Sequence, residues 1–311
     1  GVEFRSLAAS VVDEQHRFGV EQRRALVGLE AAAGSVPPHR LHMTATPIPR
    51  TLALTVWGDM SISELDESPR GRKPIITRWI THDRSSEAYR RLTRLLREGR
   101  QAYVVCPLVS PSEAIEARAA EEEAERLRSD ELSDFEVACV HGKLRAQDRR
   151  KIMRAFARGE IQALVATTVI EVGIDVPNAT IMIIQEADRF GLAQLHQLRG
   201  RVGRGAEQSY CLLVSRRKEE LTEAAVERLQ ALVETTDGFE LAEADLELRG
   251  GGHLLGVRQT GGSDLRFTRL RSDRAVLERA RATAGRLGVP DPLLADEIVR
   301  MFGDENHRGN P

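Results

Sequence analysis

The feature that most constrains the fold is a regular alternation of short apolar runs with longer amphipathic segments between residues 75 and 215. The apolar runs are the expected strands, at 75–80, 102–108, 136–140, 162–166, 180–184 and 209–214. The amphipathic segments are the expected helices, at 85–97, 113–128, 146–157 and 193–202. Strands separated by helices in this way are typical of βαβ units, whose parallel sheet is buried on both faces. The alternation therefore predicts an α/β fold.

A shorter pattern of the same kind precedes this region. Strands are expected at 7–12 and 41–43, with a helix at 21–32 between them. The turn-rich stretch 68–72 then predicts a boundary. We expect one unit over residues 1–67 and a second over residues 68–215.

The alternation stops at Arg216. Helices are expected at 218–234, 241–248 and 272–287, with a glycine-rich stretch at 250–262. Residues 216–311 are therefore expected to form a small, mainly helical domain.

Composition excludes some classes of function. The chain has 45 Lys plus Arg and 47 Asp plus Glu, for a formal net charge of -2, which rules out a globally basic nucleic-acid coat but not a local basic groove. No apolar run reaches the roughly 18 residues of a membrane span, and the three cysteines are far apart and suggest neither a disulfide framework nor a metal site. We expect a cytoplasmic protein without membrane contact.

Two adjacent carboxylates follow the first strand. Asp13 and Glu14 would lie at the carboxyl edge of a sheet, where Asp13 would hold Mg²⁺ through water and Glu14 would orient and deprotonate an attacking water. Gln15 and His16 would sense the γ-phosphate of a nucleotide. The alternative is a polar turn after a strand.

Two pairs of hydroxyl side chains also follow strands. Thr44 and Thr46 would connect the nucleotide site to a nucleic-acid site by hydrogen bonds, and Thr167 and Thr168 would donate to a phosphodiester backbone. Taken alone, each pair also fits an ordinary connection after a strand.

A second set of charged groups lies further along the chain. Asp175, after the turn at Gly173, would accept from a ribose hydroxyl or position an arginine. Arg201 and Arg204 are three residues apart and would share a helix face. Gly200 and Gly203 would clear that face, so that both guanidiniums reach the γ-phosphate as arginine fingers. The alternative is an Arg/Gly patch that binds RNA.

The glycine-rich stretch carries groups that would contact phosphates. These are Arg249, Arg258 and Gln259. By composition alone the stretch also fits a flexible linker.

Four segments in this order resemble motifs II, III, V and VI of superfamily 2 helicases. They are residues 13–20, 44–51, 166–177 and 194–205. Residues 245–262 resemble the translocation motif that the bacterial RecG family shares with the transcription-repair coupling factor. Residues 258–261 and Gln15 favour RecG. The likeness extends to about residue 270.

This resemblance implies RecA-like parallel-sheet helicase domains, the first of them partial, followed by a helical hairpin. ATP and Mg²⁺ would be bound between the domains and would drive translocation along double-stranded DNA. By the same likeness, Gln197 completes the nucleotide site with Arg201 and Arg204, and Gly173 and Asp175 also line it. Arg228, Arg249 and Gln259 match positions that transmit motion to the duplex.

The resemblance also implies partners. Members of the family act on branched DNA, such as stalled forks and Holliday junctions, in repair and recombination. Single-stranded DNA-binding protein is a further expected partner. We expect a monomer in the bacterial cytoplasm, associated with the nucleoid.

One family motif is not found. The phosphate-binding pattern G-x-x-x-x-G-K-[ST] contains a lysine, and none of Lys73, Lys143, Lys151 and Lys218 lies in it. We therefore expect this sequence to be the C-terminal part of a longer protein and to be inactive alone. Two alternatives stay open: a non-catalytic DNA-binding or regulatory module, and the coupling-factor translocase.

Overall fold

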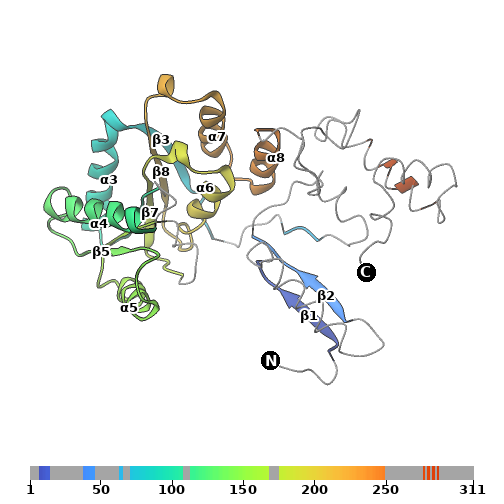
Figure 1. Ribbon diagram of the computed structural model, residues 1–311, viewed down its shortest axis with the longest axis horizontal. Helices are drawn as coiled ribbons and strands as arrows, with labels where there is room; N and C mark the ends of the chain where they lie inside the picture. Colours follow the sequence, from blue (N-terminus) through green and yellow to red (C-terminus); the bar gives the residue numbers. More distant parts are fainter. Residues whose placement is uncertain are drawn as a thin grey trace. The chain divides into compact units, whose positions relative to one another are not determined.

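The computed structural model describes most of the segment between residues 71 and 248 and two short segments before it. The described residues are 7–14, 38–45, 63–65, 71–107, 113–167, 175–248, and 276, 279, 280, 282, 283 and 286. Contacts divide the chain into one unit of residues 1–48 and 65–249 and another of residues 49–64 and 250–311. Figure 1 shows the described helices and strands.

Six of the described strands form one parallel sheet with the order β3-β8-β7-β4-β6-β5. Their bounds are β3 Ile76–Thr81, β4 Gln101–Val105, β5 Val137–Val140, β6 Ala163–Ala166, β7 Ala179–Ile184 and β8 Tyr210–Ser215. All five pairs of neighbouring strands in this sheet are parallel, so no two neighbours are joined by a hairpin. The structure therefore confirms the α/β fold with a parallel sheet.

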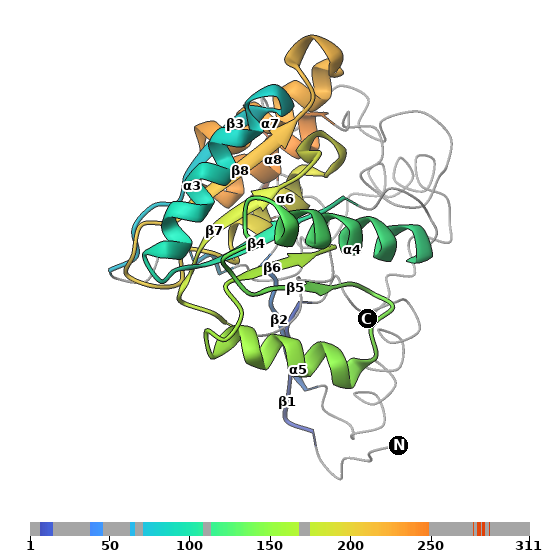
Figure 2. The ribbon, with the colours of Figure 1, turned by 90° about the vertical axis from the view of Figure 1, so that its left-hand side faces the viewer.

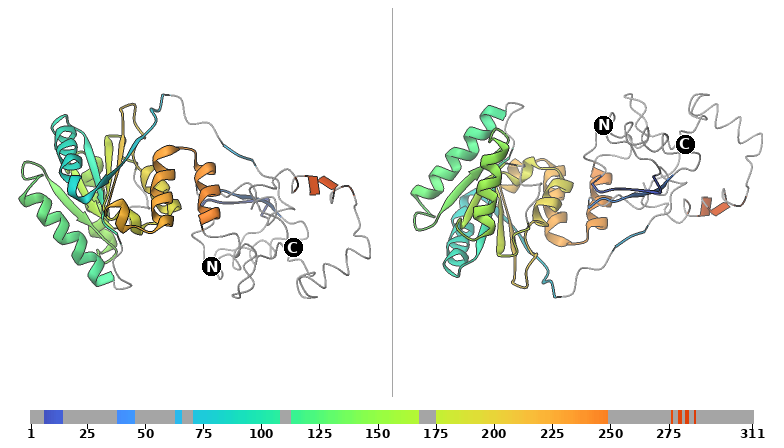
Figure 3. Two further views of the ribbon diagram at one scale, coloured as in Figure 1. Left: turned by 90° about the horizontal axis from the view of Figure 1, so that it is seen from above. Right: turned by 90° about the horizontal axis from the view of Figure 1, so that it is seen from below.

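Helices cover both faces of this sheet. The helices and 3₁₀ turns are η2 His82–Arg84, α3 Ser85–Arg97, α4 Glu113–Ser129, α5 Ala146–Ala157, η4 Ala187–Arg189, α6 Leu192–Arg199, η5 Lys218–Glu220, α7 Glu223–Glu234 and α8 Gly238–Leu248. One core contains residues of α3 and α4, and the core on the opposite face contains residues of α5, α6, α7 and α8. Figures 2 and 3 show these two layers.

The central strands are apolar along their whole length because both of their faces are buried. All six residues of β7 and all five of β4 are buried. The edge strand β3 alternates more and is only partly buried. This difference is what a parallel sheet with two covered faces requires.

Local signals explain where the last two helices of this unit begin. The Thr222 hydroxyl accepts a hydrogen bond from the Ala225 N–H and caps α7. The Asp237 carboxylate accepts from the Phe239 N–H at 2.7 Å at the start of α8. Hydroxyl and carboxylate side chains satisfy the unpaired N–H groups of a first helical turn.

Helices α7 and α8 pack on the core that α6 also covers. Leu229 and Leu232 of α7 and Leu241 of α8 are buried in it. The division of the chain at residue 216 stays a prediction, and the first helices beyond that residue share a core with the sheet.

A separate parallel pair of strands lies earlier in the chain. It consists of β1 Ala9–Val12 and β2 His39–His42, with Val11 opposite Leu41. Val12 is buried, whereas Val11 and Leu41 are 62% and 53% exposed. The expected helix at 21–32 lies outside the described residues, as does most of the one at 272–287, where the described residues are helical.

The end of α5 supplies a test of the core. Phe156 is fully buried, and its ring lies 5.0 Å from that of Tyr103 on β4. We expect Phe156→Ala to lower the free energy of unfolding by about 3–5 kcal/mol, since it leaves a cavity. Urea unfolding measures this. Gln147→Ala, an exposed change on the same helix, should stay within about 0.5 kcal/mol, and a loss below about 1 kcal/mol for Phe156→Ala would contradict the packing described here.

Candidate functional site

Three of the predicted site residues gather near Tyr103. The Arg204 Nε lies 3.5 Å from Asp175 Oδ1 and donates to the Gly200 carbonyl at 3.2 Å. Burial raises the pKa of Tyr103 to about 12, the charges of Arg201 and Arg204 act to lower it, and that of Asp175 acts to raise it. All three charged groups are therefore close enough to the same hydroxyl to affect its ionisation.

The elements that position this group are α6 and the start of β7. Helix α6 ends at Arg199, and Arg201 and Arg204 follow in the turns that lead to β8, so the expectation that both arginines share a helix face is wrong. Asp175 lies four residues before β7. Because β7 and β8 are parallel neighbours, the segments that lead into them meet at the amino edge of the sheet. Gln197 lies one turn before Arg201 on α6 and is half-buried.

Glycine is required at two positions in this segment, and Gly200 is not one of them. A Cβ at Gly200 would make only ordinary contacts, the nearest at 3.5 Å. Gly203 has a φ of +77°, and a Cβ at Gly205 would lie 2.7 Å from the carbonyl oxygen of Pro177. The close contacts with the rest of the chain therefore occur at the end of the segment, and the expected role of Gly200 and Gly203 in clearing a face for a nucleotide stays a prediction.

The two predicted carboxylates lie directly after β1. The Glu14 N–H donates to Asp13 Oδ1 at 2.9 Å, and Glu14 Oε2 accepts from the Ala45 N–H at 3.3 Å. Glu14 has a φ of 52°, in the left-handed region that residues other than glycine rarely adopt. The side chain of Glu14 thus contacts the Thr44–Ala45 segment that follows β2.

The chemistry of Asp13 fits a magnesium ion. Asp13 is exposed and carries hard oxygen donors of the kind that Mg²⁺ prefers. Within the described residues, no group of three or more His, Cys, Asp or Glu side chains could hold a metal ion.

Thr167 lies at the opposite edge of the six-stranded sheet from the arginine pair. It follows β6, is 1% exposed, and its N–H donates to the Val140 carbonyl at the end of β5. His141 follows β5 at the same edge, and its Nε2 lies 3.0 Å from Glu121 Oε1.

Arg228 connects α7 to the turn before α6. Its Nη2 donates to the backbone carbonyl of Asp188 in η4 at 3.3 Å. The Asp188 carboxylate, 2% exposed, accepts from Arg216 at 2.9 Å. The other predicted site residues lie outside the described part of the chain: Gln15, His16, Thr46, Thr168, Gly173, Arg249, Arg258 and Gln259.

Arg199 is a residue that the sequence analysis missed. It is 2% exposed, and its Nη1 donates to the carbonyls of Leu232 and Thr235, both at 2.8 Å. These carbonyls lie at the C-terminal end of α7, where backbone acceptors have no partner within the helix. Its spacing could have revealed its burial, because position 199 lies on the same face of α6 as the buried positions 192 and 195.

His196 supports Arg199 from the same helix. Its Nδ1 lies 3.1 Å from Arg199 Nη2. Burial first, and the charge of Arg199 second, lower the pKa of His196 from 6.5 to about 4, against an opposing effect of Asp237. The ring is therefore neutral at pH 7, and its Nδ1 accepts a hydrogen bond from the Arg199 guanidinium.

Within the described residues, no helix combines the length and the apolar character of a membrane span.

Comparisons with known proteins agree with the helicase resemblance. Residues 87–206 match the family "Helicase conserved C-terminal domain", and residues 235–298 match "ATP-dependent DNA helicase RecG, domain 3, C-terminal". Proteins described as "ATP-dependent DNA helicase RecG" are similar: that of Bacillus subtilis is 45% identical over 304 residues, 98% of this chain and 43% of the relative, and that of Escherichia coli K12 is 46% identical over 308 residues, 99% and 44% respectively.

A solved structure is similar as well. The "Structure of RecG bound to three-way DNA junction" superposes with a TM-score of 0.66 at 39% identity, over 89% of this chain and 34% of that one. With the parallel sheet, these likenesses confirm the expected RecA-like helicase fold. The chain spans about two fifths of the length of the curated relatives that it matches.

His196 gives a pH dependence that can be measured. Its pKa is lower in the folded chain than the ordinary 6.5, so the unfolded chain binds more protons between about pH 6.5 and pH 4. We expect the free energy of unfolding to fall by up to about 1.4 kcal/mol per pH unit as the pH drops through this window. Urea unfolding of the chain and of His196→Gln, each measured across this pH window, isolates the effect, which the variant should lose. Equal slopes of the free energy of unfolding against pH in the two proteins would contradict it.

Proposed function

We propose that this chain, which belongs to the RecG family of helicases, contributes the arginine side of an ATP-driven motor that moves along double-stranded DNA and acts on branched DNA. The observation that carries the proposal is the convergence of Asp175, Arg201 and Arg204 near Tyr103. Two guanidiniums on one short segment, with a carboxylate beside them, suit the recognition of a nucleotide triphosphate and its ribose.

The Asp175–Arg204 ion pair fits a role as a resting position for the arginine. The two side chains are 53% and 29% exposed and 3.5 Å apart. An exposed pair of this kind contributes about 0–1 kcal/mol, so Arg204 would leave it readily for the stronger charge of a γ-phosphate. Asp175 would then accept from a ribose hydroxyl.

The carboxylates after β1 would form the opposing side of the nucleotide site. Asp13 would hold Mg²⁺, which supplies positive charge against the phosphates when bound. Glu14 would orient and deprotonate the attacking water. Its bond to the Ala45 N–H supports a connection between this site and the nucleic-acid contact expected at Thr44 and Thr46. The phosphate-gripping motif would come from a part of the family's sequence that this chain does not match.

Two groups of contacts would transmit nucleotide binding to DNA. Thr167, at the carboxyl edge of the sheet, is the residue that the sequence analysis gives for donation to the phosphodiester backbone, but it is 1% exposed in this structure. Arg228, together with Arg249, Arg258 and Gln259, would carry motion from α6 through the hairpin of α7 and α8 to the duplex. The contact of Arg228 with the turn before α6 supports this route.

The details of partners and place belong to the same proposal. Branched duplex DNA is supported by the similar RecG structure, which is bound to a three-way junction. The match of residues 235–298 to the RecG domain 3 model favours this family over the coupling factor. Single-stranded DNA-binding protein as a partner, a monomeric state and a place at the bacterial nucleoid in the cytoplasm stay predictions, as does the inactivity of the chain alone.

Arg201 is the direct test. In a protein that joins this chain to the family's phosphate-binding segment, Arg201→Ala should lower ATP turnover by about 10³–10⁵, since it removes charge that stabilises the transition state. Steady-state phosphate release with forked DNA measures this. Arg217→Ala, an exposed arginine 3.8 Å from Asp83, is the matched control and should be within twofold of the unchanged protein. Turnover of Arg201→Ala within that same range would refute the assignment.

A further inference from the structure

Helix α5 carries a concentration of positive charge that the proposed function does not use. Residues 143–158 hold seven Lys or Arg and a single acid, Asp148, in a chain whose formal net charge is -2. Four of these cations line one open hollow of about 740 Å³ together with Gln147 and Asp148. We call them the α5 basic face: Arg150, Lys151, Arg154 and Arg158.

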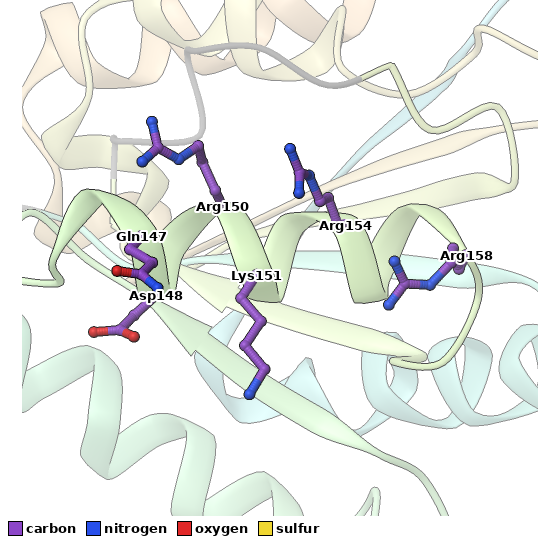
Figure 4. Close-up of a pocket in the computed structure, with 6 residues that line it drawn as sticks. All are labelled: Gln147, Asp148, Arg150, Lys151, Arg154 and Arg158. Atoms are coloured by element: carbon purple, nitrogen blue, oxygen red, sulfur yellow. The ribbon is translucent and has the colours of Figure 1, made fainter.

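The α5 basic face is held on a rigid element. The other side of the helix is anchored by Phe156, fully buried, and by the partly buried Ile152 and Met153. The side chains of the basic face are all exposed, and Figure 4 shows Arg150 and Arg154 leaving the helix on the same side. The direction of the cationic groups is therefore set by the core of the domain.

The cations of this face differ from the other exposed arginines in their partners. On α4, Arg118, Arg126 and Arg128 each form an ion pair with a glutamate of that helix. On the α5 basic face only Arg158 has such a partner, Glu160 at 2.6 Å. Among the described residues, no acidic group lies within ion-pair distance of the remaining three cations. Their charge is not neutralised within the described part of the chain.

The spacing of the face suits a phosphate backbone. Arg150, Arg154 and Arg158 follow one another at four-residue intervals, about 6 Å along the helix axis. Phosphates of one strand of duplex DNA advance by about 3.4 Å each along the duplex axis, so a row of cations about 12 Å long spans several of them. A planar guanidinium also binds two phosphate oxygens at once.

The face begins beside a surface already expected to contact DNA. Strand β5 ends at Val140, and α5 starts six residues later. The neighbouring strand β6 ends next to Thr167, whose N–H donates to the Val140 carbonyl. The N-terminal end of α5 is thus at the carboxyl edge of the sheet, and the helix carries the positive charge away from that edge.

We propose that the α5 basic face binds the phosphodiester backbone of double-stranded DNA, as a contact additional to Thr167 and to the hairpin of α7 and α8. The inference rests on the proposed function, because it assumes that duplex DNA lies along the carboxyl edge. Such a contact would hold the duplex without reading its sequence, as a motor that moves along DNA requires.

The salt dependence of DNA binding tests this inference. The 311-residue chain and a triple variant, Arg150→Gln with Lys151→Gln and Arg154→Gln, are titrated with a labelled 30-base-pair duplex between 50 and 200 mM KCl and followed by fluorescence anisotropy. Each lost phosphate contact makes the negative slope of log K against log salt shallower by about 0.9, so the slope of the triple variant should be shallower by up to about 2.7. Affinity at 50 mM KCl should fall at least tenfold.

A matched variant separates this effect from a change in net charge. Arg84→Gln with Arg94→Gln and Arg118→Gln removes three exposed arginines that have glutamate partners. Its slope should stay within about 0.5 of that of the unchanged chain. Glutamine is a good helix former, so urea unfolding should find both variants as stable as the unchanged chain.

Four results would overturn the inference. An unchanged slope in the α5 variant, with DNA binding by the parent chain intact, would remove the α5 contact and leave the proposed function standing. Equal losses in both triple variants would show an effect of net charge alone. If the α5 variant lost binding to a polyglutamate peptide but still bound duplex DNA, the face would be assigned to an acidic protein. Absence of duplex binding by the unchanged chain would count against the inference and the proposed function together.

Discussion

The arrangement of helices on one face of the sheet depends on a buried guanidinium. Arg199 gives two hydrogen bonds of 2.8 Å to carbonyls at the C-terminal end of α7. A buried charge is tolerated only where its donors are satisfied, and a helix C-terminus offers both unpaired acceptors and a favourable dipole. The same contact satisfies the charge and caps the helix, so removing either side leaves the other unsatisfied in the core.

A second contact runs in the opposite direction. Arg228 of α7 donates to the Asp188 carbonyl in the turn before α6. Helix α6 is therefore connected to α7 both before its first residue and at its last. Arg201 follows Arg199 by two residues, so the segment that would contact a nucleotide begins where α6 is fixed to α7. A displacement of that segment would be transmitted to the hairpin through the hydrogen bonds of Arg199 and Arg228, in addition to the leucine packing of the shared core.

The fold could be predicted because burial dictates the residue pattern. Central strands such as β7 are continuous apolar runs, and the observed bounds of α3 and α5 are those expected from their spacing. The convergence of Asp175 with Arg201 and Arg204 follows from parallel neighbours that begin at the same edge. The grouping of these residues near Tyr103 could not be predicted, since it depends on how the turns after α6 close over β4.

Arg199 and His196 were missed for a related reason. In a sequence, an arginine next to a glycine suggests an exposed group, and only the position of α7 shows that it has acceptors in the core. The close contact of Gly205 with the Pro177 carbonyl was missed, because the path of the chain after a helix end is set by tertiary contacts. The relation of Asp13 and Glu14 to the arginine pair stays a prediction.

Hydrogen exchange at the ends of α6 and α7 tests the central claim most directly. In Arg199→Leu, the amides of residues 231–235 in α7 and those of Gly200 and Arg201 should all exchange at least tenfold faster, while those of β4 and β7 keep their protection. This result is expected if one guanidinium joins the two helix ends. Unchanged exchange at both ends, or faster exchange at only one of them, would contradict the account.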